Sequence, residues 1–248
     1  MKPEVLIGSP ERLAIAAARR LELSAMAGLA GSGKFSLALP GGSVAEIFFP
    51  RLAQAQVDWS RIDFFWGDER AVPVSDPDSN FGLARKLWLD PAAVPAERRH
   101  RLHADFTDPA ELAAAANSDE EILLRTAGRP PRIDMFWLGV GPDGHVASLF
   151  PDHPLLAETK RYVAAVVDSP KPPRARLTMT LPAILGAKEV VVAAFGTGKA
   201  QAIAQALDPQ GPDSPLGRVI RGANRVWLLI DAAAAAQWTE NSSPEARA

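Results

Sequence analysis

One stretch of the chain limits the possible fold more than any other. Residues 135–140 (MFWLGV) form an apolar run of strand length that no charged side chain interrupts, which is typical of a strand buried on both faces of a sheet. The run ends in residues 141–144 (GPDG), a turn that no helix could cross. His145 follows directly, at the carboxyl end of the predicted strand. In open α/β sheets ligands bind along that edge, so this imidazole is a candidate acid or base.

Other apolar runs alternate with stretches of helical character. The expected strands are residues 35–39, 62–66, 133–140, 162–167, 190–195 and 226–230. The expected helices run from Ser9 to about 31, from 44 to 54, up to Trp88, from 108 to 126, up to Leu207 and from Ala232, with a frayed tail from Asn241. This alternation predicts an α/β fold, a mostly parallel, Rossmann-like sheet with helices on both faces. No linker is visible, so a single domain over residues 1–248 is expected.

Composition excludes several classes of protein. A formal net charge of -2 provides no basic field for nucleic acid, so no nucleic-acid partner is expected. No run approaches the ~20 apolar residues of a membrane span, and the first residues (MKPE) open no signal-type apolar region, which predicts a cytoplasmic protein without a membrane partner. Without cysteine there is no disulfide or thiolate nucleophile, and the four histidines form no tight ligand pattern, so no metal is expected.

A glycine turn offers a second candidate binding element. Residues 41–43 (GGS) stand between a predicted strand and a helix, where N–H groups at the positive end of the helix dipole suit a phosphate. Ser43 and Glu46 have capping-box spacing, and a cap can coexist with a phosphate site. A serine hydrolase is an alternative, because the turn nearly forms a nucleophile elbow, although Ala45 replaces its last glycine and too few strands precede it.

Charged residues also follow the strand predicted at 62–66. Asp68, Glu69 and Arg70 stand at its carboxyl end. Opposite charges beside a buried strand point to a functional site more than a solvated run of charges does. Lys199 stands in a glycine-containing turn after another predicted strand, at 190–195.

Two further functions compete with an enzyme that uses His145. The glycines within residues 139–144 spell G-x-G-x-x-G after a strand, which is typical of nicotinamide-dinucleotide binding. Pro151 and Pro154 interrupt the helix that should follow, and Asp143 would place a carboxylate near the pyrophosphate. A non-catalytic sugar-phosphate sensor would need a DNA-binding module, for which neither terminus has spare length or a basic helix.

Six stretches, in order along nearly the whole chain, resemble one family. They are PGGS at 40–43, DERAVPVSDPDSNFG at 68–82, GVGPDGHVASLFP at 139–151, SPKPP at 169–173, RLTMTLP at 176–182 and GTGKA at 196–200. They resemble the 6-phosphogluconolactonases, which share a sugar-phosphate group with glucosamine-6-phosphate deaminases and ribose-5-phosphate isomerases. A related deaminase or isomerase is an alternative, but a deaminase would be expected to carry different residues after its DE and its DGH.

The resemblance implies hydrolysis of 6-phospho-D-glucono-1,5-lactone to 6-phospho-D-gluconate in the oxidative pentose phosphate pathway, with no cofactor. It makes His145 the general base. The other implied active-site residues are Asp68, Arg70 and Lys171, and the implied substrate and phosphate contacts are Gly41, Gly42, Ser43 and Lys199, with Arg176 as a further cation. The family commonly continues its glycine turn with Thr and Pro, where this chain has Val44 and Ala45, so one potential hydroxyl contact is missing.

These residue types suit the implied reaction. Opening a lactone requires water to attack the acyl carbon, a base to take the proton, and cations or N–H groups to stabilise the oxyanion. A neutral imidazole suits the base, and Arg70 or Lys171 could face the developing charge. A phosphomonoester of about -1.5 to -2 charge needs cations and N–H groups of its own, for which Lys199 and the glycine turn are the candidates.

Overall fold

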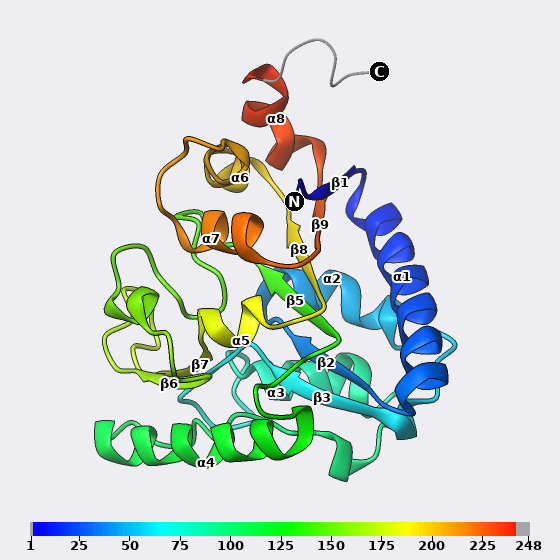
Figure 1. The fold of residues 1–248 in the computed structure, drawn as a ribbon, viewed down its shortest axis with the longest axis vertical. Helices are drawn as coiled ribbons and strands as arrows, with labels where there is room; N and C mark the ends of the chain where they lie inside the picture. Colours follow the sequence, from blue (N-terminus) through cyan, green and yellow to red (C-terminus); the bar gives the residue numbers. More distant parts are fainter. Residues whose placement is uncertain (1, 242–248) are drawn as a thin grey trace.

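The computed structural model describes residues 2–241 and has a six-stranded parallel sheet at its centre (Figure 1). Across the sheet the strands are β1 (Glu4–Ile7), β9 (Val226–Ile230), β8 (Glu189–Ala194), β5 (Met135–Gly139), β2 (Phe35–Leu39) and β3 (Ile62–Trp66). All five pairings are parallel, which confirms the predicted α/β class. The edge strand β1 was not predicted. The tail expected to fray beyond Asn241 lies outside the described residues.

Helices flank the sheet on both sides. Their bounds are α1 (Pro10–Ser32), α2 (Gly42–Leu52), α3 (Asn80–Ala84), α4 (Pro109–Ala127), α5 (Leu181–Leu185), α6 (Ala200–Leu207), α7 (Pro215–Gly222) and α8 (Ala232–Asn241). A π-helical turn, Arg85–Leu89, continues α3, and 3₁₀ turns occupy Trp59–Arg61, Ala96–Arg98, Pro154–Ala157 and Thr197–Lys199. In Figure 1, α1 lies to the right of the large sheet and α7 to its left.

The ends of the long helices follow local chemistry. Ser9 caps α1 by accepting a hydrogen bond from the N–H of Arg12, and Gly33 ends that helix in the left-handed region with φ of 73°. Asp108 caps α4 by accepting hydrogen bonds from two N–H groups of its first turn. These three positions confirm the bounds that the sequence predicts.

The start of α2 differs from the prediction. Its N-cap is Gly41, which has no side chain to cap the helix, and Ser43 lies inside the first turn. The predicted capping box of Ser43 and Glu46 is therefore wrong. The strand ends at Leu39 and only Pro40 separates it from the cap, so the helix begins too early for Ser43 to take the cap position.

A second sheet, which the sequence analysis did not predict, adjoins the large one. Its three antiparallel strands are, in order, β4 (Asp68–Arg70), β7 (Arg176–Met179) and β6 (Val163–Val166), of which β6 and β7 are labelled at the left in Figure 1. The strand predicted at 162–167 exists as β6, but it belongs to this sheet. The strand β4 could not be predicted because three residues are too few to show the alternation of a strand. The strand β7 could not be predicted because it buries two polar residues, Arg176 and Thr178, among its apolar ones. The register pairs Arg70 with Arg176 and so joins two distant motifs.

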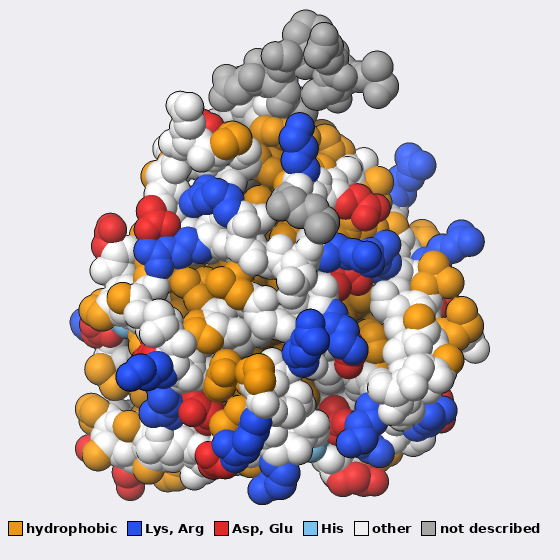
Figure 2. Space-filling view, in the orientation of Figure 1, with side chains coloured by type: hydrophobic (Ala, Val, Ile, Leu, Met, Phe, Trp, Pro, Cys, Tyr) orange, Lys and Arg blue, Asp and Glu red, His pale blue; other side chains and the backbone are white. Residues whose placement is uncertain are grey.

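The surface carries no single dominant charge on the face shown in Figure 2, where acidic and basic side chains are interspersed with apolar ones. Within residues 2–241, no helix has the length and apolar character needed to cross a membrane.

An aromatic cluster fills the core beside α2. Trp88 is fully buried, and its ring lies 5.3 Å from Phe49, 5.5 Å from Trp59 and 5.5 Å from Phe64, measured between centroids. Tilted and edge-on rings at this spacing add to the stabilisation from apolar burial. Trp88 thus connects α2 and β3 to the segment that follows α3.

Replacing Trp88 with alanine should lower the free energy of unfolding by about 3–5 kcal/mol, because the cavity cannot collapse between three fixed rings. Urea denaturation measures the loss. Met26→Ala, on the exposed face of α1, is the control and should change stability by less than about 0.5 kcal/mol. A loss below about 1 kcal/mol for Trp88→Ala would contradict this account of the core.

Candidate active site

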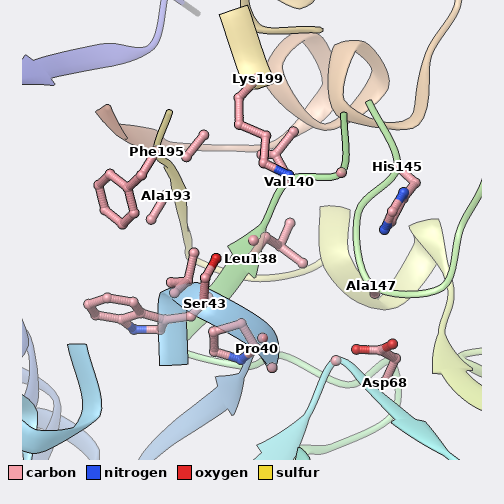
Figure 3. Close-up of a pocket in the computed structure, with 18 of the residues that line it drawn as sticks. Pro40, Ser43, Asp68, Leu138, Val140, His145, Ala147, Ala193, Phe195 and Lys199 are labelled. Carbon is pink, nitrogen blue, oxygen red and sulfur yellow. The ribbon is translucent and has the colours of Figure 1, made fainter. Parts of the chain in front are cut away.

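The order of the strands fixes where the candidate site lies. From β2 the chain moves to β3 on one side, and after β5 it passes through β6 and β7 of the small sheet before it enters β8 on the other side, so the connections after β2 and β5 diverge. Open α/β sheets bind ligands at such a switch point, beyond the carboxyl ends of the strands. A pocket of about 190 Å³ lies there, lined by the segments that follow β2, β3, β5 and β8 (Figure 3).

Most of the predicted site residues line this pocket. Those that do are Gly41, Gly42, Ser43, Asp68, Arg70, His145, Arg176 and Lys199. Lys171 does not line it, but its ammonium nitrogen lies 3.3 Å from Nδ1 of His145. The structure therefore brings eight of the nine together and places the ninth beside the imidazole.

His145 is held by the turn that follows β5. The N–H of Gly141 donates to the carbonyl of His145 at 2.9 Å, which closes the turn. A Cβ on Gly141 would lie 2.0 Å from Nδ1 of His145, so only glycine leaves room for the ring. The ring also packs on Phe150, with centroids 4.7 Å apart. In Figure 3 the imidazole projects from this turn toward Ala147 and Asp68.

Asp143 determines the tautomer of the neutral His145 ring, and thus which ring nitrogen can accept a proton. Nδ1 of His145 lies 2.5 Å from Oδ1 of Asp143, and a carboxylate can only accept. The hydrogen bond therefore assigns the proton of the neutral ring to Nδ1 and leaves Nε2 as an acceptor. Lys171 donates to the same Oδ1 at 3.4 Å. The sequence places Asp143 near a possible pyrophosphate but does not reveal this contact with His145, which depends on the fold of the turn.

The surroundings keep His145 neutral near pH 7. Burial lowers the pKa of His145, and the charge of Lys171 acts in the same direction, while Asp143 and Asp68 raise it without reversing the shift. Burial tends to raise the pKa of Asp143, but the charges of His145 and Lys171 together with the hydrogen bonds from His145 outweigh it, so the pKa of Asp143 is lowered. At neutral pH the pair is thus a carboxylate and an uncharged imidazole.

Asp68 and two arginines form the floor of the pocket. The Asp68 side chain is 8 % exposed, and its Oδ2 lies 3.9 Å from Nε of Arg70 and 3.8 Å from Nη1 of Arg176. Arg176 is buried and donates to the carbonyls of Lys171, Pro172 and Pro173, so it secures the proline-rich segment.

Glu69 points away from the pocket, because neighbouring residues of a strand face opposite sides. Its carboxylate accepts from the N–H groups of Asn80 and Phe81 at the start of α3, and from that of Arg70. Burial raises the pKa of Glu69 in spite of these hydrogen bonds. Adjacent acids thus have separate tasks: Asp68 faces the pocket, and Glu69 anchors α3.

The opposite end of the pocket is suited to an anion. The first N–H groups of α2 have no acceptor within the helix, and no hydrogen bond of the Ser43 hydroxyl occurs among the described residues. The Lys199 ammonium likewise has no hydrogen bond or ion pair within residues 2–241. Burial lowers the pKa of Lys199, and Lys171 acts in the same direction. In Figure 3, Ser43 and Lys199 extend into the pocket from opposite walls.

The nicotinamide interpretation of residues 139–144 fails on local structure. No helix follows Gly144; the chain makes turns and enters a 3₁₀ segment only at Pro154. Two of the three glycines have other causes: Gly141 makes room for the ring of His145, and Gly144 has φ of 79°. The motif therefore shapes the turn that carries His145.

Comparison with known proteins decides the family. The family model described as glucosamine-6-phosphate isomerases/6-phosphogluconolactonase matches residues 8–228. The chain belongs to this family. A 6-phosphogluconolactonase of Streptomyces coelicolor is 41% identical over 251 residues, covering 96% of this chain and 95% of the relative. One of Mycobacterium tuberculosis is 40% identical over 230 residues, covering 90% and 93%.

Solved structures share the fold of this family member. A 6-phosphogluconolactonase structure from Trypanosoma brucei matches with a TM-score of 0.83 and 27% identity, covering 95% of this chain and 98% of that one. A monomeric glucosamine-6-phosphate deaminase has a TM-score of 0.79 at 20% identity, covering 96% and 100% of the chains. The second likeness shows the common fold alone.

We expect an NMR titration of the His145 ring to give a pKa below about 6.5, the ordinary value for histidine, because burial disfavours the charged ring. Asp143→Asn should lower the pKa further, since the carboxylate that stabilises the imidazolium is gone. The signal is assigned by its loss in His145→Ala. A wild-type pKa at or above 6.5, or a higher pKa in Asp143→Asn, would contradict the described electrostatics.

Proposed function

We propose that this chain is a 6-phosphogluconolactonase, which hydrolyses 6-phospho-D-glucono-1,5-lactone to 6-phospho-D-gluconate in the pentose phosphate pathway. The observation that carries the proposal is the imidazole of His145, with Nδ1 bound to Asp143 and Nε2 left as an acceptor in a pocket with cations. About 40% identity over nearly the full length to proteins named 6-phosphogluconolactonase supports the choice of substrate.

In the proposed reaction His145 acts as the general base. Nε2 takes a proton from water while the water oxygen attacks the lactone carbonyl carbon, and the carbonyl electrons move to its oxygen. When the oxyanion collapses, the bond to the ring oxygen breaks, and the imidazolium returns its proton to that oxygen. Asp143 and Asp68 stabilise the transient positive charge of the ring, since both carboxylates favour its protonated form.

Arg70 is our choice for the group that faces the oxyanion. Arg70 lines the pocket, its Nη1 donates to the carbonyl of Asp78 at 2.8 Å, and no hydrogen bond of its Nη2 occurs among the described residues. Lys171 suits this task less, because its ammonium lies at the Nδ1 side of His145 and is paired with Asp143. We assign Lys171 to orienting the His145–Asp143 pair.

The phosphate group is proposed to bind at the opposite end of the pocket. There the start of α2 offers N–H groups and the positive end of the helix dipole, and Lys199 offers an ammonium group with no partner within residues 2–241. Because these are mainly backbone groups and a separate lysine, the presence of Val44 and Ala45 in place of Thr and Pro leaves the arrangement usable.

The direct test is hydrolysis of freshly generated 6-phosphogluconolactone, corrected for its spontaneous reaction. His145→Ala should lower kcat by about 10²- to 10⁴-fold, the usual contribution of a positioned base. His103→Ala removes a partly exposed histidine that does not line the pocket, and it should keep wild-type turnover. Equal rates for wild type and the uncatalysed reaction would reject the proposed function.

Ser43→Ala separates water activation from a serine nucleophile. As a phosphate contact, Ser43 should mainly affect KM and leave kcat within about tenfold, whereas loss of a nucleophilic oxygen would abolish turnover. Steady-state kinetics and mass spectrometry of the wild type with substrate distinguish the two cases. An inactive Ser43→Ala protein, together with an acyl adduct on the wild-type serine, would overturn the general-base mechanism.

Lys199→Ala should weaken the use of the phosphorylated lactone by roughly 1.5–3 kcal/mol in kcat/KM, since one charge-assisted contact is lost. Unphosphorylated gluconolactone should be affected little. Lys34→Ala, an exposed lysine outside the pocket, is the matched control and should leave both substrates unchanged. If Lys199→Ala affects both lactones equally, Lys199 does not recognise the phosphate.

A further inference from the structure

A tight turn directly after His145 places one residue in the pocket and the next beneath it. The N–H of Leu149 donates to the carbonyl of Val146 at 2.9 Å, and Ala147 has φ of 49°, in the left-handed region. A residue with a side chain adopts that region only where surrounding contacts enforce it. Ala147 lines the pocket, while Ser148 is fully buried.

Ser148 is connected on three sides. Its N–H donates to the Thr178 hydroxyl oxygen at 3.2 Å, and its own hydroxyl donates to Oδ2 of Asp68 at 2.7 Å. The same hydroxyl oxygen accepts from Nη1 of Arg176 at 3.3 Å. Because Arg176 can only donate, the Ser148 proton must point to Asp68. The direction of this hydrogen bond is therefore fixed.

The Asp68 carboxylate lies closer to the Ser148 hydroxyl than to either of the two neighbouring arginines. Oδ2 of Asp68 is 3.8 Å from Arg176 and 3.9 Å from Arg70, beyond hydrogen-bond distance. Oδ1 accepts from the Asn80 amide at 3.2 Å, so both carboxylate oxygens are bound to neutral donors. Meanwhile Nε of Arg70 is buried and has no hydrogen-bond partner among the described residues.

We infer that Ser148 is a positioning residue, which holds the Asp68 carboxylate out of hydrogen-bonded contact with Arg70 and Arg176 and thereby keeps Asp68 acting on the His145 ring and Arg70 available to the lactone oxyanion. The inference rests on the proposed function. Without the Ser148 hydroxyl, Oδ2 of Asp68 would lose its short hydrogen bond and close the gap of less than 4 Å to an arginine. The ion pair, now at 3.8–3.9 Å, would then become a hydrogen-bonded one, which would occupy the Arg70 guanidinium and turn the carboxylate away from the His145 ring.

Ser148→Ala should lower kcat by about ten- to a hundredfold, the range for one lost hydrogen bond to a charged group, and change KM little. The acid limb of the pH profile should move to lower pH. Three charged groups act on the pKa of His145, and two of them, Asp143 and Lys171, are unchanged in this variant. The third, Asp68, raises that pKa in the wild type, so its withdrawal should lower the pKa of His145. Ser36→Ala is the matched control, because its buried hydroxyl donates to Asp134 at the other end of the sheet at 2.8 Å. It should keep wild-type kinetics.

A double-mutant cycle with Asp68→Ala decides between positioning and general damage. If Ser148 acts through Asp68, adding Ser148→Ala to Asp68→Ala should change kcat by less than about twofold. Independent, multiplying losses would overturn the inference, as would wild-type kinetics in Ser148→Ala. Ser148→Cys, which keeps the volume but only a weak donor, repeats the cycle should Ser148→Ala fail to fold, and the same criteria apply. An inactive wild type rejects the proposed function instead, so the two failures are distinguishable.

Discussion

The hydrogen bond between Nδ1 of His145 and the Asp143 carboxylate is the interaction on which the candidate site depends. It assigns the ring proton to one nitrogen and leaves the other to face the pocket. Burial acts on the same ring by disfavouring its charged form, so the neutral imidazole predominates near pH 7. Neither effect suffices alone: burial without Asp143 would leave the ring free to choose its tautomer, and Asp143 without burial would favour the imidazolium.

The two sheets contribute different residues to the site. The parallel sheet brings the ends of β2 and β5 together where their connections diverge, which places the glycine turn and His145 around one pocket. The antiparallel sheet adds the charges, because pairing of β4 with β7 sets Arg70 opposite Arg176 and Asp68 opposite Thr178. This chain shares its fold with a glucosamine-6-phosphate deaminase of 20% identity, so the fold alone does not determine the reaction.

Much of this organisation is predictable from the sequence because long-range burial leaves a local pattern. An uninterrupted apolar run followed by GPDG predicts both β5 and the place of His145. The small sheet escapes prediction, since β4 has three residues and β7 buries an arginine and a threonine. The roles of Asp143 and Ser148 escape it too, because they depend on distances between side chains. The cap assigned to Ser43 failed because local spacing does not fix where α2 begins.

Successive side chains of β4 point to opposite sides, and this limits how the sequence of the chain can change in this region. Asp68 and Glu69 are chemically similar neighbours, yet one faces the pocket and the other binds the start of α3. A slip of β4 by one residue against β7 would exchange them, putting the longer acid into the pocket and leaving the N–H groups of α3 to the shorter one. The pairing with β7 sets this register, so the connection between Arg70 and Asp78 can change in length more easily than the strand can shift by one residue.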